Sequence, residues 1–235
     1  MENNILFKNI QDNINNVLEE IFSAAKNAGR NPDEIKLMAV TKTKPLEYAE
    51  AAYNAGIRLF GENRVQEMED KFSSFHNDAE IHLIGHLQRN KVKKVVPLAA
   101  SIDSIDKYET AEEISKQGKV LGKNVSILLE YNTSGEQSKS GFLSEKELFE
   151  SIDKIRKLEN IKIRGLMTIA PFTDDEKAIR KSFRMLADLY KELDKKHPDL
   201  NIDTLSMGMS SDFKIAIEEG SNIIRIGTRL FGQRN

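Results

Sequence analysis

The residues best suited to chemistry are two lysines at the end of an apolar run. Residues 35–45 read Ile-Lys-Leu-Met-Ala-Val-Thr-Lys-Thr-Lys-Pro, a run of strand length that a proline closes. Alternation along a strand sets Lys42 on the same side as Met38 and Val40. An ammonium in apolar surroundings loses its proton more readily, and the neutral amine can form a Schiff base with an aldehyde. The alternative is that Lys42 and Lys44 are solvated residues at a strand end.

Two later turns have the composition of an anion site. Residues 207–212 read Met-Gly-Met-Ser-Ser-Asp between an apolar run and a helical stretch, and this pattern places Ser210 as the N-cap of the helix. Gly227 and Thr228 follow the last apolar run in the same way. A helix start presents unpaired N–H groups, and glycine lets the backbone come close to an anion. The pattern therefore predicts a phosphate site. The simpler reading is that Ser210 only caps its helix and Gly227 only turns the chain.

Arg225 is a charged residue inside the last apolar run. Ile224 and Ile226 suit packing against helices, so alternation turns Arg225 to the opposite, inner side. A salt bridge inside the protein is one explanation. The other is that Arg225 donates to a ligand acceptor such as a pyridine nitrogen. Because arginine does not deprotonate, that nitrogen would stay unprotonated and the ring would be a weaker electron sink.

The elements that must position these residues are short apolar runs alternating with helical stretches. Such a rhythm without hairpin signals predicts parallel strands joined by crossover helices, and eight strands close a (β/α)8 TIM barrel. An open, doubly wound sheet is the competing arrangement. In a barrel the site forms where strands end, which is where Lys42 lies and where Asn63 follows the second run. The expected strands are 35–41, 58–60, 81–84, 99–103, 125–132, 162–167, 203–205 and 223–226.

An extra helix is expected before the barrel. Asn3 or Asn4 would cap it, and it would end near Gly29. Among the other helical stretches, residues 174–193 carry the clearest periodicity. The expected buried stripe of the first helix consists of Leu6, Ile10, Ile14, Val17, Leu18 and Ile21.

Composition sets the class of protein. The 235 residues suffice for one barrel domain, 1–235, and the net charge of −2 gives no reason to expect nucleic acid as a partner. The absence of cysteine excludes disulfides and thiolate chemistry. We expect a cytoplasmic protein without a membrane partner, because the sequence has neither a signal-peptide pattern nor an apolar run of about 18 residues.

Other motifs do not predict a site. Residues 118–123 are one residue too short for a P-loop and lack the following Ser or Thr. The four histidines show no metal-ligand spacing, so we expect no metal, and His82 is interpreted as an interior residue. The basic stretch 89–94 is interpreted as a solvated helix face.

Taken together, the motifs resemble those of the YggS/PROSC family of pyridoxal-phosphate homeostasis proteins over nearly the whole chain. The resemblance implies a barrel similar to the N-terminal domain of alanine racemase, with pyridoxal 5'-phosphate bound to Lys42. It also implies phosphate contacts from Ser210, Gly227 and Thr228, Arg225 at the pyridine nitrogen, and Asn63 and Met209 lining the site. The matching stretches are 39–45, 60–63, 82–91, 138–141, 165–168, 205–210 and 225–228.

The implied function is vitamin B6 homeostasis, in which a monomer buffers the cofactor or delivers it to apo-enzymes without established catalysis. The alternative is a pyridoxal-phosphate-dependent amino-acid racemase, which needs a proton donor or acceptor on both faces of the carbanion. Lys42 could serve one face, whereas Tyr131 is a weak candidate for the other because alternation turns it away from Glu130 and Asn132. A cofactor-free, lysine-dependent aldolase is a third possibility.

Overall fold

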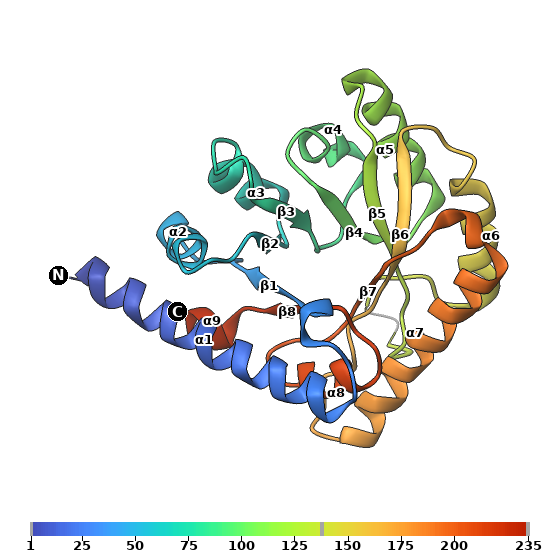
Figure 1. Ribbon diagram of the computed structural model, residues 1–235. Coiled ribbons are helices and arrows are strands. Elements are labelled where there is room, and N and C mark those ends of the chain that lie inside the picture. The colour runs from blue at the N-terminus through green and yellow to red at the C-terminus, as the bar shows by residue number, and fades with distance from the viewer. Residues whose placement is uncertain (1, 137–138, 234–235) are drawn as a thin grey trace.

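The chain folds into a closed barrel of parallel strands wrapped by helices (Figure 1). The computed structural model describes residues 2–136 and 139–233. The strands follow one another around the barrel in chain order, and β8 closes the ring by pairing with β1. The predicted (β/α)8 barrel is therefore confirmed, and the open sheet is excluded. The strands are β1 (Lys36–Val40), β2 (Leu59–Glu62), β3 (Glu80–Leu83), β4 (Ser101–Ile105), β5 (Val125–Glu130), β6 (Ile161–Met167), β7 (Thr204–Ser206) and β8 (Ile223–Ile226).

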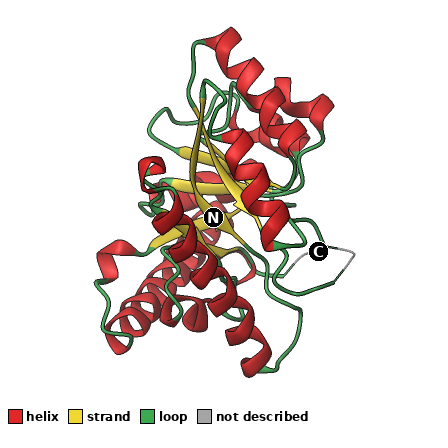
Figure 2. Ribbon diagram, turned by 90° about the vertical axis from the view of Figure 1, so that its right-hand side faces the viewer, coloured by secondary structure: helices red, strands yellow, loops and turns green. Residues whose placement is uncertain are grey.

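Helices surround the strands on the outside, as Figure 2 shows with strands in yellow and helices in red. Within the described residues, no helix combines the length and the apolar character needed to cross a membrane. The helices are α1 (Glu2–Asn27), α2 (Leu46–Asn54), α3 (Val65–Phe72), α4 (Val92–Val95), α5 (Tyr108–Leu121), α6 (Glu145–Ile155), α7 (Glu176–Lys196), α8 (Phe213–Glu218) and α9 (Thr228–Phe231), with 3-10 turns η1 (Pro32–Glu34), η2 (Arg89–Lys91) and η3 (Pro198–Leu200).

The extra helix α1 precedes the barrel and packs against α2, α8 and α9 (Figure 1). Its buried stripe contains Ile10, Ile14, Val17 and Ile21, as predicted. Two expectations are wrong. Leu18 is 43% exposed, because the residue after Val17 is rotated by about 100° around the helix and leaves the stripe. The proposed asparagine caps at residues 3 and 4 lie inside the helix, which already begins at residue 2.

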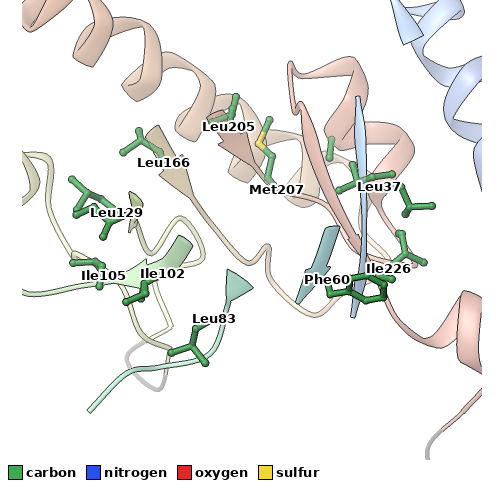
Figure 3. Packing of buried hydrophobic residues seen from close by; sticks show 14 of the residues in the cluster. Leu37, Phe60, Leu83, Ile102, Ile105, Leu129, Leu166, Leu205, Met207 and Ile226 are labelled. Carbon is green, nitrogen blue, oxygen red and sulfur yellow. The ribbon is translucent and has the colours of Figure 1, made fainter. Parts of the chain in front are cut away.

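Alternation along the strands separates two apolar layers. Leu37 and Ala39 face outward and join the large core between strands and helices, part of which Figure 3 shows. Met38 and Val40 face inward and form a smaller cluster with Leu59 inside the barrel. The alternation predicted around Lys42 is therefore confirmed for the residues that precede it.

The second strand is longer at its C-terminal end than predicted. Gly61 and Glu62 lie beyond the expected strand 58–60, but both belong to β2. A Cβ at Gly61 would lie 2.7 Å from Met38 Sδ, so the absence of a side chain makes room for the methionine inside the barrel. Glu62 is fully buried at the end of the strand. This extension places Asn63 directly at the C-terminal end of the barrel.

Candidate functional site

Lys42 lies in a tight turn between β1 and α2. The amide of Lys44 donates to Thr41 O at 3.0 Å, which closes the turn around residues 42 and 43. Thr43 has φ of 63°, a left-handed conformation that is uncommon for a β-branched residue. Lys42 is half-buried, and its strand pairs with β2 on one side and β8 on the other. The lysine therefore lies at the C-terminal end of the barrel, as predicted.

Gly208 and Met209 lie in the turn that follows β7. The backbone of this turn packs closely against α8. Gly208 has φ of +98°, and a Cβ there would lie 2.5 Å from Ala216 Cβ in α8. Gly208 O also accepts a hydrogen bond of 3.0 Å from Arg225 N, which fixes this turn beside β8. Asp212 Oδ1 in turn accepts a 2.5 Å hydrogen bond from Met209 N.

The expectation that Ser210 caps the following helix is wrong. Helix α8 begins at Phe213, and its N-cap residue is Asp212. Ser210 lies two residues earlier in the turn and is half-buried. The Asp212 side chain makes no capping hydrogen bond to the helix; its Oδ1 accepts from Met209 N in the preceding turn instead. The hydroxyl of Ser210 takes part in no hydrogen bond among the described residues and so can still contact a ligand.

Gly227 and Thr228 form the turn after β8 and begin α9. A Cβ at Gly227 would lie 3.1 Å from Val40 O, so this glycine sits close against the end of β1. The N–H groups in the first turn of a helix have no partner within that helix. The turns that carry Lys42 and Thr228 are thus neighbours across the β1–β8 pair.

Arg225 points into the barrel, as predicted. It is 4% exposed, and it donates to Ser206 Oγ and to Thr168 O, both at 2.7 Å. These direct hydrogen bonds go to neutral oxygens rather than to a carboxylate. Burial lowers the pKa of Arg225, whereas the nearby Asp103, Asp212 and Glu130 favour its charged form. Since arginine remains protonated in proteins, it supplies a fixed positive charge beneath the site.

A pocket of about 180 Å³ opens among the ends of β2, β3, β5 and β6, and we call it the mouth pocket. Asn63 Oδ1 is buried and has no hydrogen-bond partner among the described residues. Burial raises the pKa of Glu130 to about 7, with a further contribution from the negative charge of Asp106. The pocket is lined by Asn63, Ile84, Gly85, His86, Glu130, Tyr131, Asn132, Lys139, Ser140 and Ile169. A larger hollow of about 540 Å³ lies outside the barrel against α7, and no predicted site residue lines it.

The structure also shows where the predicted residues near the mouth pocket lie. Tyr131 belongs to the outer hydrophobic core, so the prediction that it turns away from Glu130 is confirmed. His82 is buried and its Nδ1 lies 2.8 Å from Asp103 Oδ2, which confirms its interior position. Sequence reasoning did not identify Glu130 as a site residue, although alternation already placed it on the inner face. Ser138, part of a motif that supported the family resemblance, lies outside the described residues.

Fold and strand-end residues together define a class of protein: a (β/α)8 barrel with a lysine at the end of its first strand and glycine-containing turns after its last two. Residues 11–235 match the family model described as alanine racemase, N-terminal domain. The chain belongs to this family and, within it, to the pyridoxal phosphate homeostasis proteins. The resemblance found in the motifs is therefore confirmed.

Relatives with that name match the whole chain. The pyridoxal phosphate homeostasis protein of Aquifex aeolicus is 42% identical over 229 residues, which cover 96% of this chain and 99% of the relative. The protein of the same name from Vibrio cholerae is 42% identical over 233 residues, covering 97% and 98%.

Solved structures agree with these relatives. PipY of Synechococcus elongatus, in a structure with pyridoxal phosphate bound, is 34% identical with a TM-score of 0.79, and the match covers 90% of this chain and all of PipY. A protein of unknown function from Bifidobacterium adolescentis is 36% identical with a TM-score of 0.89, covering 97% and 96%. An alanine racemase of Clostridium difficile is 19% identical with a TM-score of 0.73 over 92% of this chain and 56% of its own, a likeness of fold alone.

Proposed function

We propose that this protein binds pyridoxal 5'-phosphate at the C-terminal end of its barrel and takes part in the homeostasis of that cofactor. The main support is that PipY, 34% identical over its full length, has a structure with pyridoxal phosphate bound. The residues that we assign to the cofactor come from the ends of four neighbouring strands, β7, β8, β1 and β2. They are Lys42, Asn63, Met209, Ser210, Arg225, Gly227 and Thr228.

The strand ends fit such a ligand in two respects. Asn63 Oδ1 is a buried acceptor that lacks a partner among the described residues, and a bound polar molecule would satisfy it. A Cβ at Gly227 would lie 3.1 Å from Val40 O, so this glycine lets the start of α9 pack close to the end of β1, beside the turn of Lys42. An unpaired buried acceptor such as Asn63 Oδ1 is costly without a ligand, and a bound ligand that donates to it would remove that cost.

Each residue has a defined task in this proposal. Pyridoxal phosphate, when bound, supplies an aldehyde that condenses with a primary amine, and the amine that we assign to it is Lys42. Ser210 and Thr228 donate hydroxyl hydrogen bonds to the phosphate, with N–H groups of the turn at Gly227. Arg225 keeps its proton and donates to the pyridine nitrogen, which therefore stays unprotonated. This restrains carbanion chemistry and favours holding the cofactor over amino-acid turnover.

The proposal extends to a cytoplasmic monomer that supplies the cofactor to apo-enzymes. The name of the relatives, pyridoxal phosphate homeostasis protein, supports only the part of this proposal that concerns control of the cofactor. Size-exclusion chromatography with light scattering tests the monomer. Mixing the cofactor-loaded protein with a purified apo-enzyme, and measuring the transfer of pyridoxal phosphate between them, tests delivery.

Borohydride reduction followed by peptide mapping tests the cofactor assignment. We expect a yellow protein whose pyridoxyl label is found on Lys42, and Lys42→Ala should lose both colour and label. Lys44→Ala is the matched control, because Lys44 Nζ donates to Gln233 O at 2.8 Å and is held toward the end of the chain. A label confined to Lys44 would refute the assignment.

A further inference from the structure

The turn that carries Lys42 is held in a strained conformation. Thr43 has φ of 63°, in a left-handed region that a β-branched side chain disfavours. Thr43 is exposed, so packing of its side chain does not explain the conformation. A strained backbone persists only where the surrounding structure determines it, and the groups beneath this turn must therefore hold it.

Lys71, in the last turn of α3, lies beneath the turn with its ammonium group fully engaged. Its Nζ donates to Thr41 O at 2.8 Å, to Glu62 Oε1 at 2.6 Å and to Glu67 Oε2 at 3.1 Å. A lysine ammonium has three N–H donors, so all of them are used. The side chain is only 9% exposed, which shields these bonds from competing water.

Two carboxylates extend the contacts of Lys71 to both sides of Lys42. Glu62 Oε1 accepts from the hydroxyl of Thr41 at 2.7 Å. Glu67 Oε2 accepts from the backbone N–H of Thr43 at 2.6 Å. The residues immediately before and after Lys42 are thereby bonded to one network centred on a single ammonium.

The charges in this network depend on one another. Burial raises the pKa of Glu62, and hydrogen bonds from Lys71 and Thr41 oppose that rise. Burial acts in the same direction on Glu67, but the bonds from Thr43 N–H and Lys71 outweigh it and lower its pKa. Without the ammonium, two neighbouring carboxylates would repel each other, and the acceptor for Thr43 N–H would no longer be fixed.

We propose that Lys71 is a positioning residue that fixes the turn around Lys42, with Glu62 and Glu67 as its anchors. The inference rests on the proposed function of Lys42 as the amine that captures the cofactor. A purely stabilising ion pair would not need to bond the backbone on both sides of a strained lysine turn. Buried ion pairs also often contribute little net stability, which leaves geometry as the explanation for this one.

The test compares the apo-protein with Lys71→Met, a substitution that keeps the length of the side chain and removes its charge. Hydrogen–deuterium exchange of the peptide containing Thr43 should become faster, while exchange in β1 stays slow. The rate at which added pyridoxal phosphate produces its visible absorption band should fall by about tenfold or more, because small displacements of a reacting group are costly. The pH profile of that rate should also change.

Two further variants serve as a control and as a fallback for this test. Lys94→Met is the matched control, because Lys94 of α4 pairs with Glu69 of α3 at an exposed site, and it should leave both readouts unchanged. If Lys71→Met does not fold, the double variant Glu62→Gln with Lys71→Met removes the ion pair as a unit and should show the same slow capture. Unchanged capture and unchanged Thr43 exchange in a folded variant would overturn the inference.

The two proposals fail in different ways. If the wild-type protein forms no absorption band with pyridoxal phosphate, the proposed function itself is wrong. If the wild type forms the band and the Lys71 variants form it at the same rate, only the positioning role is wrong.

Discussion

Arg225 Nη1 donates a hydrogen bond of 2.7 Å to Ser206 Oγ, and this bond joins β8 to β7 inside the barrel. A second bond of 2.7 Å from Nη2 to Thr168 O reaches the residue that follows β6. One buried cation therefore connects three consecutive strands directly below the turns that we assign to the cofactor. The same charge faces Asp103, Asp212 and Glu130, so its loss affects more than two hydrogen bonds.

Replacing Arg225 by methionine should destabilise the apo-protein strongly. The substitution leaves buried carboxyl groups without their cation, and losing one partner of a buried charge cluster typically costs about 3–5 kcal/mol. Urea unfolding near neutral pH measures the loss. Arg184→Met is the control, because Arg184 is largely exposed and Glu219 keeps its ion pair with Arg180, so the loss of stability should be much smaller. Similar losses for both variants would contradict this view of Arg225.

Glu130 should make the stability of the apo-protein depend on pH. Burial raises its pKa from 4.5 to about 7, so the folded state holds a proton that the unfolded state releases. The stabilising contribution is complete below pH 4.5 and is lost as the pH rises through about 7. The shift corresponds to a loss of order 3 kcal/mol.

Glu130→Gln isolates this contribution. The difference in unfolding free energy between variant and wild type, measured in urea at several pH values from 5 to 8, should grow in favour of the variant as the pH rises. Other titrating groups are common to both proteins and cancel in the difference. A difference that stays constant across this range would show that Glu130 does not titrate there.

The phosphate assignment predicts a selective loss of affinity. Ser210→Ala and Thr228→Val each remove one hydroxyl donor, and a hydrogen bond to a charged group contributes about 1.5–3 kcal/mol. Each variant should therefore bind pyridoxal phosphate roughly ten- to a hundredfold more weakly. Equilibrium titration should show that the affinity for pyridoxal, which lacks phosphate, is unchanged. Equal losses for both compounds would place the phosphate elsewhere.

The barrel could be predicted from the sequence because its strands and helices are marked by patterns of neighbouring residues. The longer apolar runs can be identified by themselves, and the eighth strand, Ile223–Ile226, has the bounds that were expected. Inward and outward faces followed from alternation, which placed Arg225 and Tyr131 correctly. The expected second strand ended at residue 60 and left out Gly61 and Glu62, since nothing local reveals that Met38 needs the space beside Gly61.

The parts of the site that the sequence did not predict depend on contacts between elements. Lys71 is nine residues from Glu62, and only the fold shows its side chain reaching back to Thr41 O. The raised pKa of Glu130 needs the burial that the closed barrel provides. Ser210 and Asp212 are both good N-cap residues, and the length of the turn decides between them.

Glu20 should anchor α1 to the barrel in a pH-dependent way. It forms an ion pair with Arg229 of α9, and its Oε2 lies 2.6 Å from Lys214 Nζ of α8. Hydrogen bonds from Arg229 and then Lys214 lower its pKa from 4.5 to about 2. A lowered pKa means that the contribution is complete above pH 4.5 and is lost as the pH falls through about 2. Because the site is partly solvated, we expect about 1 kcal/mol rather than the larger value that the shift alone implies.

Glu20→Gln should therefore lower the unfolding free energy by about 1 kcal/mol at pH 7, and this penalty should shrink as the pH approaches 3. Urea unfolding at low and high salt measures it, and added salt should reduce it because the pair is partly exposed. Glu19→Gln is the matched control, since the neighbouring Glu19 is exposed on the solvent side of α1 and should show no penalty. If both substitutions cost the same at every pH, the lost stability reflects helix charge in general, and Glu20 does not tie α1 to α8 and α9.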